Sequence, residues 1–310
     1  MSWMSSDIDV VTVGHALVDI RILVENFPGI DQESKVLEQS WGSGGSAVNV
    51  AIGVRRLGLK SSILAKIGFD SFGRIIVDDL LKEGVDISGL RISLGQTGFT
   101  IVAINKKGEI TMYGYKGAAE TLGPYDLSEY AISRAKWIHI ASLRLDTTIE
   151  ALRIAEKYGL KSSWDPGRVL ASQGLEKMKP VVSRVNVVFL NHKEATMLTG
   201  IEDYKQAAKE IASTGPETVV VKRGEKGVYI YSRELEDEIP AYRVEKVIDT
   251  TGAGDAFASG FITGLLKGYS LRKALQYGNA VAALKISSLG SHGVPTHDEV
   301  VRFIWERGGI

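Results

Sequence analysis

The segment VIDTTGAGDAF (residues 247–257) joins an apolar, strand-like run to the start of an apolar helix. The small residues Gly252, Ala253 and Gly254 occupy this junction, and we expect the helix to begin just after Asp255. Amides at a helix N-terminus lack intrahelical acceptors and stabilise anions together with the helix dipole. A carboxylate beside such an anion hole suits phosphoryl transfer, because it can accept the proton of an attacking hydroxyl. The alternative from the residues alone is that Asp255 only caps the helix.

Composition narrows the class of protein. The 310 residues are 44% apolar and 24% charged, which fits one large α/β domain with a sizeable core. The 37 Lys and Arg residues equal the 37 Asp and Glu residues, so bulk charge gives no indication of a nucleic-acid partner. The absence of cysteine excludes disulfides, thiolate metal sites and a cysteine nucleophile. Residues 1–9 lack the pattern of a signal peptide and no run approaches ~18 apolar residues, so we expect a cytoplasmic protein without a membrane partner.

Short β-rich runs alternate with helical patterns along most of the chain. The expected strands are 8–13, 62–67, 137–140, 161–164, 185–190 and 218–222. The expected helices are 47–57, 72–83, 147–158, 204–212, 256–266 and 271–288. This alternation predicts an α/β fold of the Rossmann-like type, with a mostly parallel sheet covered by helices on both faces. No linker or repeat divides the chain, so residues 1–310 are predicted to form a single domain.

Two regions interrupt this alternation. Residues 15–41 and 95–117 contain strand-like runs at 17–24, 35–40, 100–105 and 110–115, with a hairpin turn expected at Lys107-Gly108. We interpret them as a small β-sheet inserted into the α/β domain, acting as a lid.

A second glycine cluster, GSGGSA (residues 42–47), matches the loose dinucleotide-binding pattern, and Asp70 follows where an acid would bind ribose. This favours an NAD-dependent dehydrogenase as an alternative. However, that fingerprint belongs to the first strand-to-helix turn, whereas the first expected strand here ends at Gly14. The P-loop, the G-x-S-x-G elbow and the H-E-x-x-H motif are absent.

The motif DTTGAGD (residues 249–255) and the segment GSGGSAVNVAIGVRRLG (residues 42–58) resemble the two signatures of the ribokinase-like (PfkB-type) carbohydrate and nucleoside kinases. The similarity extends over nearly the whole chain. It implies a Rossmann-like domain with a small β-lid that covers the substrate and often forms a homodimer interface. It also implies ATP, or alternatively ADP, as phosphate donor together with Mg²⁺.

The resemblance assigns roles to individual residues. Asp255 would be the catalytic base, and the amides of Gly252, Ala253 and Gly254 the anion hole. The acceptor pocket would consist of a carboxylate at a strand end, a glycine pair and an asparagine: Asp19, Gly44, Gly45 and Asn49. Asp19 could instead be an exposed strand residue. Asn49 lies in an otherwise apolar helix, where a buried amide needs a hydrogen-bond partner.

On the donor side, Asn191 and Glu194 of NHKE would organise Mg²⁺ and the donor phosphates, the metal being bound through water. The nucleotide-binding strand, turn and helix would contribute Lys222, Gly224, Gly227 and Asn279. Alternatively, Lys222 is simply solvated and Glu194 only complements a helix dipole. Asp249 and Thr251 fit the family's monovalent-cation site, but the loop SSLGSHGVP (residues 287–295) departs in length from ribokinase, which leaves potassium dependence open.

The acceptor is less well determined, because the family phosphorylates ribose, fructose phosphates, ketodeoxygluconate and nucleosides. Arg144 and Arg168 lie near the ends of expected strands and could bind a phosphate or carboxylate, as in ribose-1-phosphate. The aromatic residues Phe99, Tyr113 and Tyr115 could instead stack on a nucleoside base. A non-catalytic sugar or nucleotide sensor on the same fold is an alternative of another class.

Overall fold

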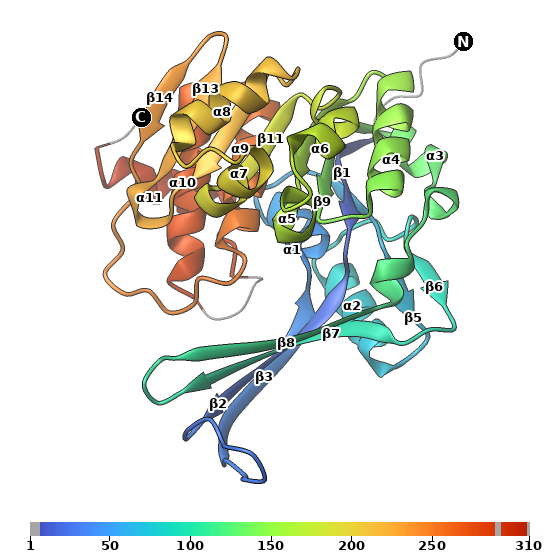
Figure 1. Cartoon of the computed structure of the whole chain (residues 1–310), viewed down its shortest axis with the longest axis vertical. Helices are drawn as coiled ribbons and strands as arrows, with labels where there is room; N and C mark the ends of the chain where they lie inside the picture. Colours follow the sequence, from blue (N-terminus) through green and yellow to red (C-terminus); the bar gives the residue numbers. More distant parts are fainter. Residues whose placement is uncertain (1–6, 289–292, 309–310) are drawn as a thin grey trace.

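The computed structural model describes residues 7–288 and 293–308, which form an α/β body and a smaller sheet that projects from it (Figure 1). Within the described residues, the body contains an eight-stranded sheet of order β14-β13-β12-β11-β10-β9-β1-β4. Its strands are β1 (Ile8–Gly14), β4 (Ser61–Leu64), β9 (Ala135–Ala141), β10 (Lys161–Asp165), β11 (Val187–Asn191), β12 (Thr218–Lys222), β13 (Val228–Ser232) and β14 (Glu236–Ile239). All neighbouring strands from β4 to β12 pair in parallel, whereas β13 and β14 are antiparallel additions at one edge.

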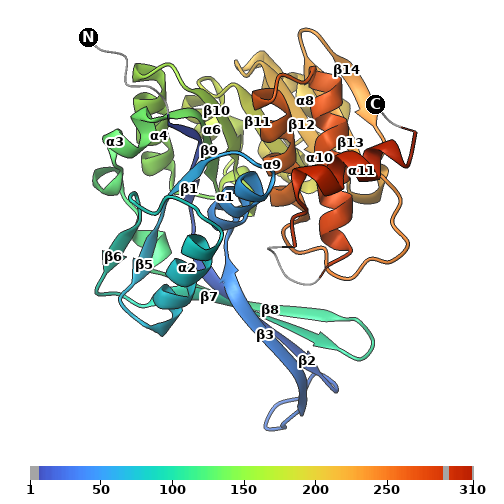
Figure 2. The ribbon, with the colours of Figure 1, turned by 180° about the vertical axis from the view of Figure 1, so that it is seen from behind.

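Alternate residues of the central strands point to opposite faces, and each face packs against its own helices. Val188 and Leu190 of β11 contribute to the core on the face seen in Figure 1, and Val187 and Phe189 to the core on the face seen in Figure 2. The first face is covered by α4 (Leu145–Lys157), α6 (Leu175–Val182), α7 (His192–Thr199) and α8 (Tyr204–Ser213). The second is covered by α1 (Ser46–Arg56), α9 (Ala253–Leu266) and α10 (Leu271–Ile286). The predicted fold class is confirmed.

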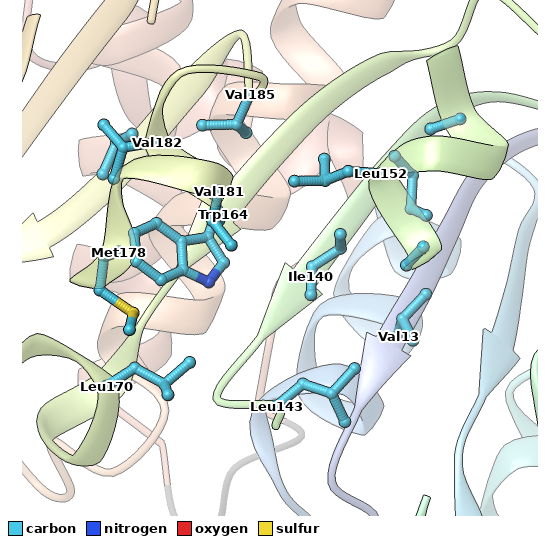
Figure 3. Close-up of a cluster of buried hydrophobic side chains, with 14 of the residues drawn as sticks. Val13, Ile140, Leu143, Leu152, Trp164, Leu170, Met178, Val181, Val182 and Val185 are labelled. Carbon is cyan, nitrogen blue, oxygen red and sulfur yellow. The ribbon is translucent and has the colours of Figure 1, made fainter. Parts of the chain in front are cut away.

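The core on the first face is organised around Trp164, whose side chain has no exposed area (Figure 3). Met178 and Val181 of α6 and Leu170 of α5 (Gly167–Ala171) pack in the same cluster. Burying a side chain of this size stabilises the fold by roughly 1.5–3 kcal/mol. This packing holds β10 and the segment after it in place. The last residue of β10, Asp165, belongs to the site described below.

The second sheet has the order β3-β2-β7-β8, and α2 (Ser71–Lys82) packs on its base. Its strands are β2 (Leu17–Val24), β3 (Val36–Gly44), β7 (Thr97–Asn105) and β8 (Ile110–Gly117). These correspond to the four strand-like runs expected in the two interrupting regions. The turn between β7 and β8 contains Gly108 with a φ of 79°, a conformation that glycine adopts at no steric cost.

Several elements differ from the sequence expectation. The strand expected at 62–67 is divided into β4 and β5 (Lys66–Gly68), and β5 pairs with β6 (Arg91–Ser93). α10 ends at Ile286, and α9 begins at Ala253, three residues early, because Gly252 adopts a left-handed φ of 73° and forms the N-cap. The elements not predicted include β13, β14, α3 (Glu129–Ser133), α5, α6, α11 (His297–Trp305) and the short 3₁₀ turns Ala118–Thr121 and Pro124–Asp126. A first helical turn at Glu194 and a turn after Lys222 were expected, and they correspond to α7 and to the 3₁₀ turn Gly224–Lys226.

Candidate active site

Asp255 lies in the first turn of α9 and faces Asn49 of α1. Its Oδ2 accepts a hydrogen bond of 2.7 Å from Asn49 Nδ2. Burial has the largest effect on the Asp255 carboxyl and raises its pKa, against the lowering effects of Asn49 and the Lys222 ammonium. The N-cap alternative is wrong, because Gly252 occupies that position and the Asp255 side chain points to Asn49.

The amides before Asp255 are not all free. Ala253 N donates to the Thr250 carbonyl at 3.1 Å, so the expected set of three free amides is wrong in this respect. Gly254 and Asp255 occupy the second and third positions of α9, where amides have no intrahelical acceptor. A Cβ on Gly254 would lie 3.1 Å from Lys222 Nζ. An anion bound here would therefore meet helix amides and an ammonium group together.

The predicted acceptor residues lie close to Asp255. A Cβ on Gly44 would lie 2.3 Å from Asp19 Oδ2, so only glycine permits this approach. Gly45 has a φ of 91°, and a Cβ there would lie 2.4 Å from the His15 carbonyl oxygen. The Asp19 residue is 7% exposed, which rules out a solvated strand residue. Asn49 Oδ1 is buried and accepts no hydrogen bond from any described residue, which leaves it available to a ligand.

Arg21 is a charged residue beside Asp19 that was not predicted to belong to the site. Its Nη2 lies 3.8 Å from Asp19 Oδ2 and its Nε lies 3.4 Å from Asp249 Oδ2. Burial raises the pKa of Asp19, and Arg21 opposes this shift. The signal was available, because residues two apart in a strand share a face and Arg21 follows Asp19 at that spacing.

The proposed monovalent-cation residues are already engaged. Asp249 Oδ1 accepts from Thr251 N at 2.8 Å, and the Asp249 carbonyl accepts from Lys285 Nζ at 2.9 Å. Lys285 belongs to α10 and is 0% exposed, and burial lowers its pKa. With Arg21 also beside Asp249, two fixed cationic groups lie where a cation was expected. Residues 289–292 of the loop considered above lie outside the described residues.

Most of the predicted nucleotide-binding residues line one cavity of about 660 Å³, but Asn191 does not. Lys222, Gly224, Gly227, Gly254 and Asn279 all contribute to it. Much of the remaining wall is apolar, which suits a planar base, and includes the side chains Val228, Tyr242, Val244, Val247, Phe257 and Ile286. Asn279 Nδ2 also donates to the carbonyls of Ile239 and Pro240, at 3.2 and 3.0 Å. Residues 241–247, which follow β14, also form part of the cavity wall through their apolar side chains. This part of the wall was not predicted from the sequence.

Lys222 connects this cavity to an acidic group. Its Nζ lies 2.7 Å from Asp165 Oδ2, and its side chain is only 16% exposed, so the solvated alternative is wrong. Burial would lower the pKa of Lys222, but the negative charges of Asp165 and Glu194 raise it. Asp165 was not predicted, although it ends a strand in WDPGR at the edge where ligands bind in open α/β sheets.

Asn191 and Glu194 form a reciprocal capping box at the start of α7. Asn191 N donates to Glu194 Oε2 at 2.8 Å, and Glu194 N donates to Asn191 Oδ1 at 2.9 Å. Burial, reinforced by Asp165, raises the pKa of Glu194. No group of three potential ligands for a metal occurs in the part of the chain that the structure describes. Mg²⁺ usually binds one or two carboxylates and completes its shell with water and substrate phosphates, so Glu194 could hold it without further protein carboxylates.

Arg144 and Arg168 line a second cavity, of about 790 Å³. The Arg144 guanidinium forms two hydrogen bonds with Asp146, of 3.0 and 2.6 Å, and its side chain is half exposed. The ion pairs found among the described residues do not include Arg168. The two arginines therefore line the same cavity, but only Arg144 is held in an ion pair among the described residues.

The chain matches the model of the pfkB family of carbohydrate kinases over residues 7–297. It belongs to this family. It is accordingly a carbohydrate kinase, an enzyme that transfers phosphate to a hydroxyl group.

Individual relatives of this pfkB kinase span its whole length. An ATP-dependent ribose-1-phosphate kinase of Halopiger xanaduensis is 32% identical over 96% of this chain and 98% of its own. An Escherichia coli protein solved with ATP and Mg²⁺ has a TM-score of 0.86 and 26% identity, covering 96% and 99% of the two chains. Arabidopsis thaliana ribokinase, solved with ribose and ATP, shares the fold with a TM-score of 0.86 at 22% identity, covering 96% and 98%.

The dehydrogenase alternative is wrong for this pfkB kinase. Its glycines at 42–47 lie at the end of β3 in the small sheet and directly after it, rather than after the first strand of the body. Asp70 caps α2, accepting from Gly73 N at 2.8 Å and from Thr97 N at 2.7 Å. The aromatic residues considered for a nucleoside base are partly engaged as well: Phe99 packs against Phe72 and Tyr115, with ring centroids 5.9 and 5.7 Å apart. No helix within residues 7–288 and 293–308 has the length and apolar character needed to cross a membrane.

Proposed function

We propose that this kinase transfers the terminal phosphate of ATP to a hydroxyl of a sugar or sugar derivative, with Asp255 as general base. The observation that carries the proposal is the hydrogen bond between Asp255 and Asn49 beside the first turn of α9 and the Lys222 ammonium. A proton acceptor thus lies next to a site for the transferring phosphate. Phosphoryl transfer to an alcohol requires both groups side by side.

The donor nucleotide binds in the 660 Å³ cavity. Its base lies against the apolar wall near Val247 and Asn279, and its phosphates extend towards Lys222 and Gly254. ATP is supported by the ATP-dependent Halopiger relative and by the E. coli structure with ATP and Mg²⁺. Because ATP is an intracellular metabolite, we place the enzyme in the cytoplasm.

The acceptor is oriented by Asp19 and Asn49. Asp19 is buried next to Gly44 and accepts hydrogen bonds from sugar hydroxyls, and the unpaired Asn49 Oδ1 accepts another. The attacking hydroxyl lies at Asp255, which takes its proton as the bond to phosphorus forms. The Gly254 amide and Lys222 stabilise the charge on the transferring group.

Mg²⁺ would be held at Glu194 through water, near Asn191 and the donor phosphates. When bound, it neutralises charge on the phosphate oxygens. Glu194 fits this role because it is buried beside Lys222 and uses one oxygen, Oε2, in its capping box.

The surroundings of Asp249 fit a monovalent cation less well than those of Glu194 fit Mg²⁺. Arg21 and the Lys285 ammonium already compensate Asp249. We therefore propose that Lys285 supplies the fixed positive charge behind the anion hole and that catalysis needs no potassium.

The small sheet serves as a lid and as a homodimer interface. One of its faces has a cross-strand row, Trp41, Ile20, Ile101 and Tyr113, in register across all four strands. Trp41 and Tyr113 are 60% and 63% exposed. Ile20 and Ile101 between them are partly buried, and Ile20 packs against the core at the base of the sheet. Exposed aromatic residues at both edges of a projecting sheet are typical of an interaction surface. Asp19 points to the opposite face, because side chains alternate along β2.

The direct test is phosphate transfer measured with ATP and with ADP against a panel of sugars, sugar phosphates and nucleosides. The proposal predicts Mg²⁺-dependent transfer from ATP to at least one sugar or sugar derivative. Binding of nucleotide without transfer to any acceptor would favour the sensor alternative and contradict the proposal. Transfer confined to nucleosides would support the nucleoside-kinase alternative instead.

A further inference from the structure

The second cavity lies at the point where the strand order of the body sheet reverses. β1 has β4 on one side and β9 on the other, and Gly14 of β1 is in register with Ala141 of β9. The residues that follow, His15 and Ser142, both line the cavity. Ligands of open α/β sheets bind outside the carboxyl ends of the strands at such a reversal.

The backbone at this position is strained. Ser142 has a φ of 48°, in the left-handed region that residues other than glycine rarely adopt. A Cβ on Gly167 would lie 2.4 Å from Ser142 Oγ, so the two loops approach closely. Strain of this kind is concentrated at binding and catalytic sites. It is a second indication, independent of topology, that the cavity is a functional site.

The charges around the cavity are unbalanced. Its walls contain Lys116, Arg144, Arg168 and Lys177 but only two acids, Glu120 and Asp146. Arg144 and Asp146 neutralise each other. Within residues 7–288 and 293–308, no ion pair includes Lys116, Arg168 or Lys177. Three positive side chains against one acid leave a surplus that attracts an anion.

The cavity borders the acceptor centre. The positive charge of Lys116 acts on both His15 and Asp19, which places this residue of the small sheet next to both. Gly45 of the acceptor pocket lies against the His15 carbonyl. On the other side, Pro166 and Gly167 follow Asp165, the partner of Lys222.

We propose that the acceptor is a sugar that already carries a phosphate group, and that Arg168 and Lys177 bind this phosphate while Lys116 approaches it from the small sheet. This assignment rests on the proposed function. Arginine matches phosphate through two parallel hydrogen bonds, and three cations suit a dianion better than a single carboxylate. A neutral sugar would leave the surplus of positive charge on the cavity walls without an anion in the cavity.

The reaction then balances as follows. The free hydroxyl oxygen of the sugar phosphate forms a bond to the terminal phosphorus of ATP, and the bond from that phosphorus to the ADP oxygen breaks. The hydroxyl proton passes to Asp255, and ADP and a sugar bisphosphate are released. The phosphate in the second cavity takes no part in bond making and only positions the sugar.

The test compares ribose 1-phosphate, ribose and ketodeoxygluconate as acceptors for the full-length enzyme with ATP and Mg²⁺, and for the variants Arg168→Gln and Lys177→Met. We expect ribose 1-phosphate to give the highest kcat/KM. Each variant should lower this value by about 10- to 100-fold, mostly through KM, as loss of a charge-assisted hydrogen bond does. Transfer to unphosphorylated ribose should change less than threefold. Lys179→Met is the matched control, because Lys179 is an exposed lysine of α6 that does not line the cavity.

Binding separates this proposal from the proposed function. Ribose 1-phosphate should bind by calorimetry without nucleotide, and the double variant Arg168→Gln/Lys177→Met should lose this binding while it keeps ATP binding. A higher kcat/KM for ribose or ketodeoxygluconate, or equal losses on all acceptors, would overturn the phosphate assignment and leave the kinase assignment intact. Phosphate-dependent binding without transfer to any acceptor would support the subsite and contradict the proposed function.

Discussion

At the scale of single residues, close contacts explain why particular residue types occur in the acceptor pocket. Asp19 is buried between Gly44 and Arg21, and Asn49 spans the distance to Asp255. Each of these polar groups would be costly to bury without its neighbours or a ligand. Small displacements of these groups should therefore impair the acceptor pocket, and point substitutions can produce such displacements.

Gly44→Ala tests the placement of Asp19. The new Cβ would lie 2.3 Å from Asp19 Oδ2 and would force the carboxylate aside. A displacement of this size should lower kcat/KM for the acceptor by about 10²-fold, with ATP affinity unchanged. Steady-state kinetics and calorimetric ATP titration measure both. Gly42→Ala in the same strand is the control, because its Cβ would only approach Asp79 Oδ2, at 3.7 Å, and it should remain within a few-fold of the parent enzyme.

Lys285→Met tests the fixed charge behind the anion hole. The parent enzyme should have equal turnover in potassium and in tetramethylammonium salts, and an unchanged melting temperature between them. The variant should lose roughly tenfold in turnover, less than the ~10²–10³-fold that follows removal of a direct anion-hole donor. Saturable activation or stabilisation of the parent enzyme by potassium would show that Lys285 does not replace the ion.

At the scale of secondary-structure elements, one motif caps α7 and supplies Glu194, the residue proposed to hold Mg²⁺ through water. Burial raises the pKa of Glu194, so its ionised form destabilises the folded chain. This penalty is absent below the ordinary pKa of the carboxyl and fully present above the raised one. Gln at this position keeps the acceptor for Asn191 N and removes the charge.

Glu194→Gln should therefore be more stable relative to the parent enzyme at pH 8 than at pH 4, by thermal denaturation. Its half-saturating Mg²⁺ concentration in the kinase assay should rise several-fold. Glu299→Gln is the matched control, because Glu299 forms the capping box of α11 but has a lowered pKa, mainly from its hydrogen bond with the Thr296 backbone. Its pH trend should have the opposite sign, and its Mg²⁺ requirement should not change.

The same scale shows what the sequence could predict. Alternation of apolar runs gave the parallel strands and most of the long helices, because those elements are buried and strongly periodic. The start of α9 was placed three residues late, since the left-handed conformation of Gly252 cannot be read from periodicity. β13 and β14 were missed because they are short additions to a sheet edge whose pairing is decided by tertiary contacts.

The residues of the site could be predicted only where they belong to the sequence motifs. Asp255, Asn49, Lys222 and the glycines converge as expected. Asp165 and Lys285 were not found, because each pairs with a residue distant in the sequence. Arg21 was overlooked, although its spacing of two residues from Asp19 in β2 indicated a shared face. The pairing of Arg144 with Asp146 was missed although the two are neighbours, since a short loop gives no periodic signal.

At the scale of the whole molecule, we predict that two copies of the chain form a dimer through the projecting sheet. Trp41 and Tyr113 lie at the two edges of an apolar row on that sheet, and a second copy would bury them. Light scattering after size exclusion should give the mass of a dimer, and Trp41→Lys should give a monomer that still binds ATP. Tyr125→Lys, at a fully exposed aromatic residue outside this sheet, should remain dimeric. A monomeric parent enzyme at micromolar concentration would exclude the interface.

The whole fold places one cavity, proposed for the donor, beside Gly254, and a second, proposed for the acceptor phosphate, beyond the ends of β1 and β9. The most direct test of this account is the turnover of Asp255→Asn, which keeps the size of the side chain and removes its basicity. We predict a loss of at least ~10²–10⁴-fold in turnover, with unchanged ATP binding. The melting temperature should not fall, because burial disfavours the Asp255 charge that this substitution removes. The parent enzyme should also lose activity as the pH falls through the raised pKa of Asp255. Turnover of Asp255→Asn within tenfold of the parent enzyme would contradict the assignment of Asp255 as the base.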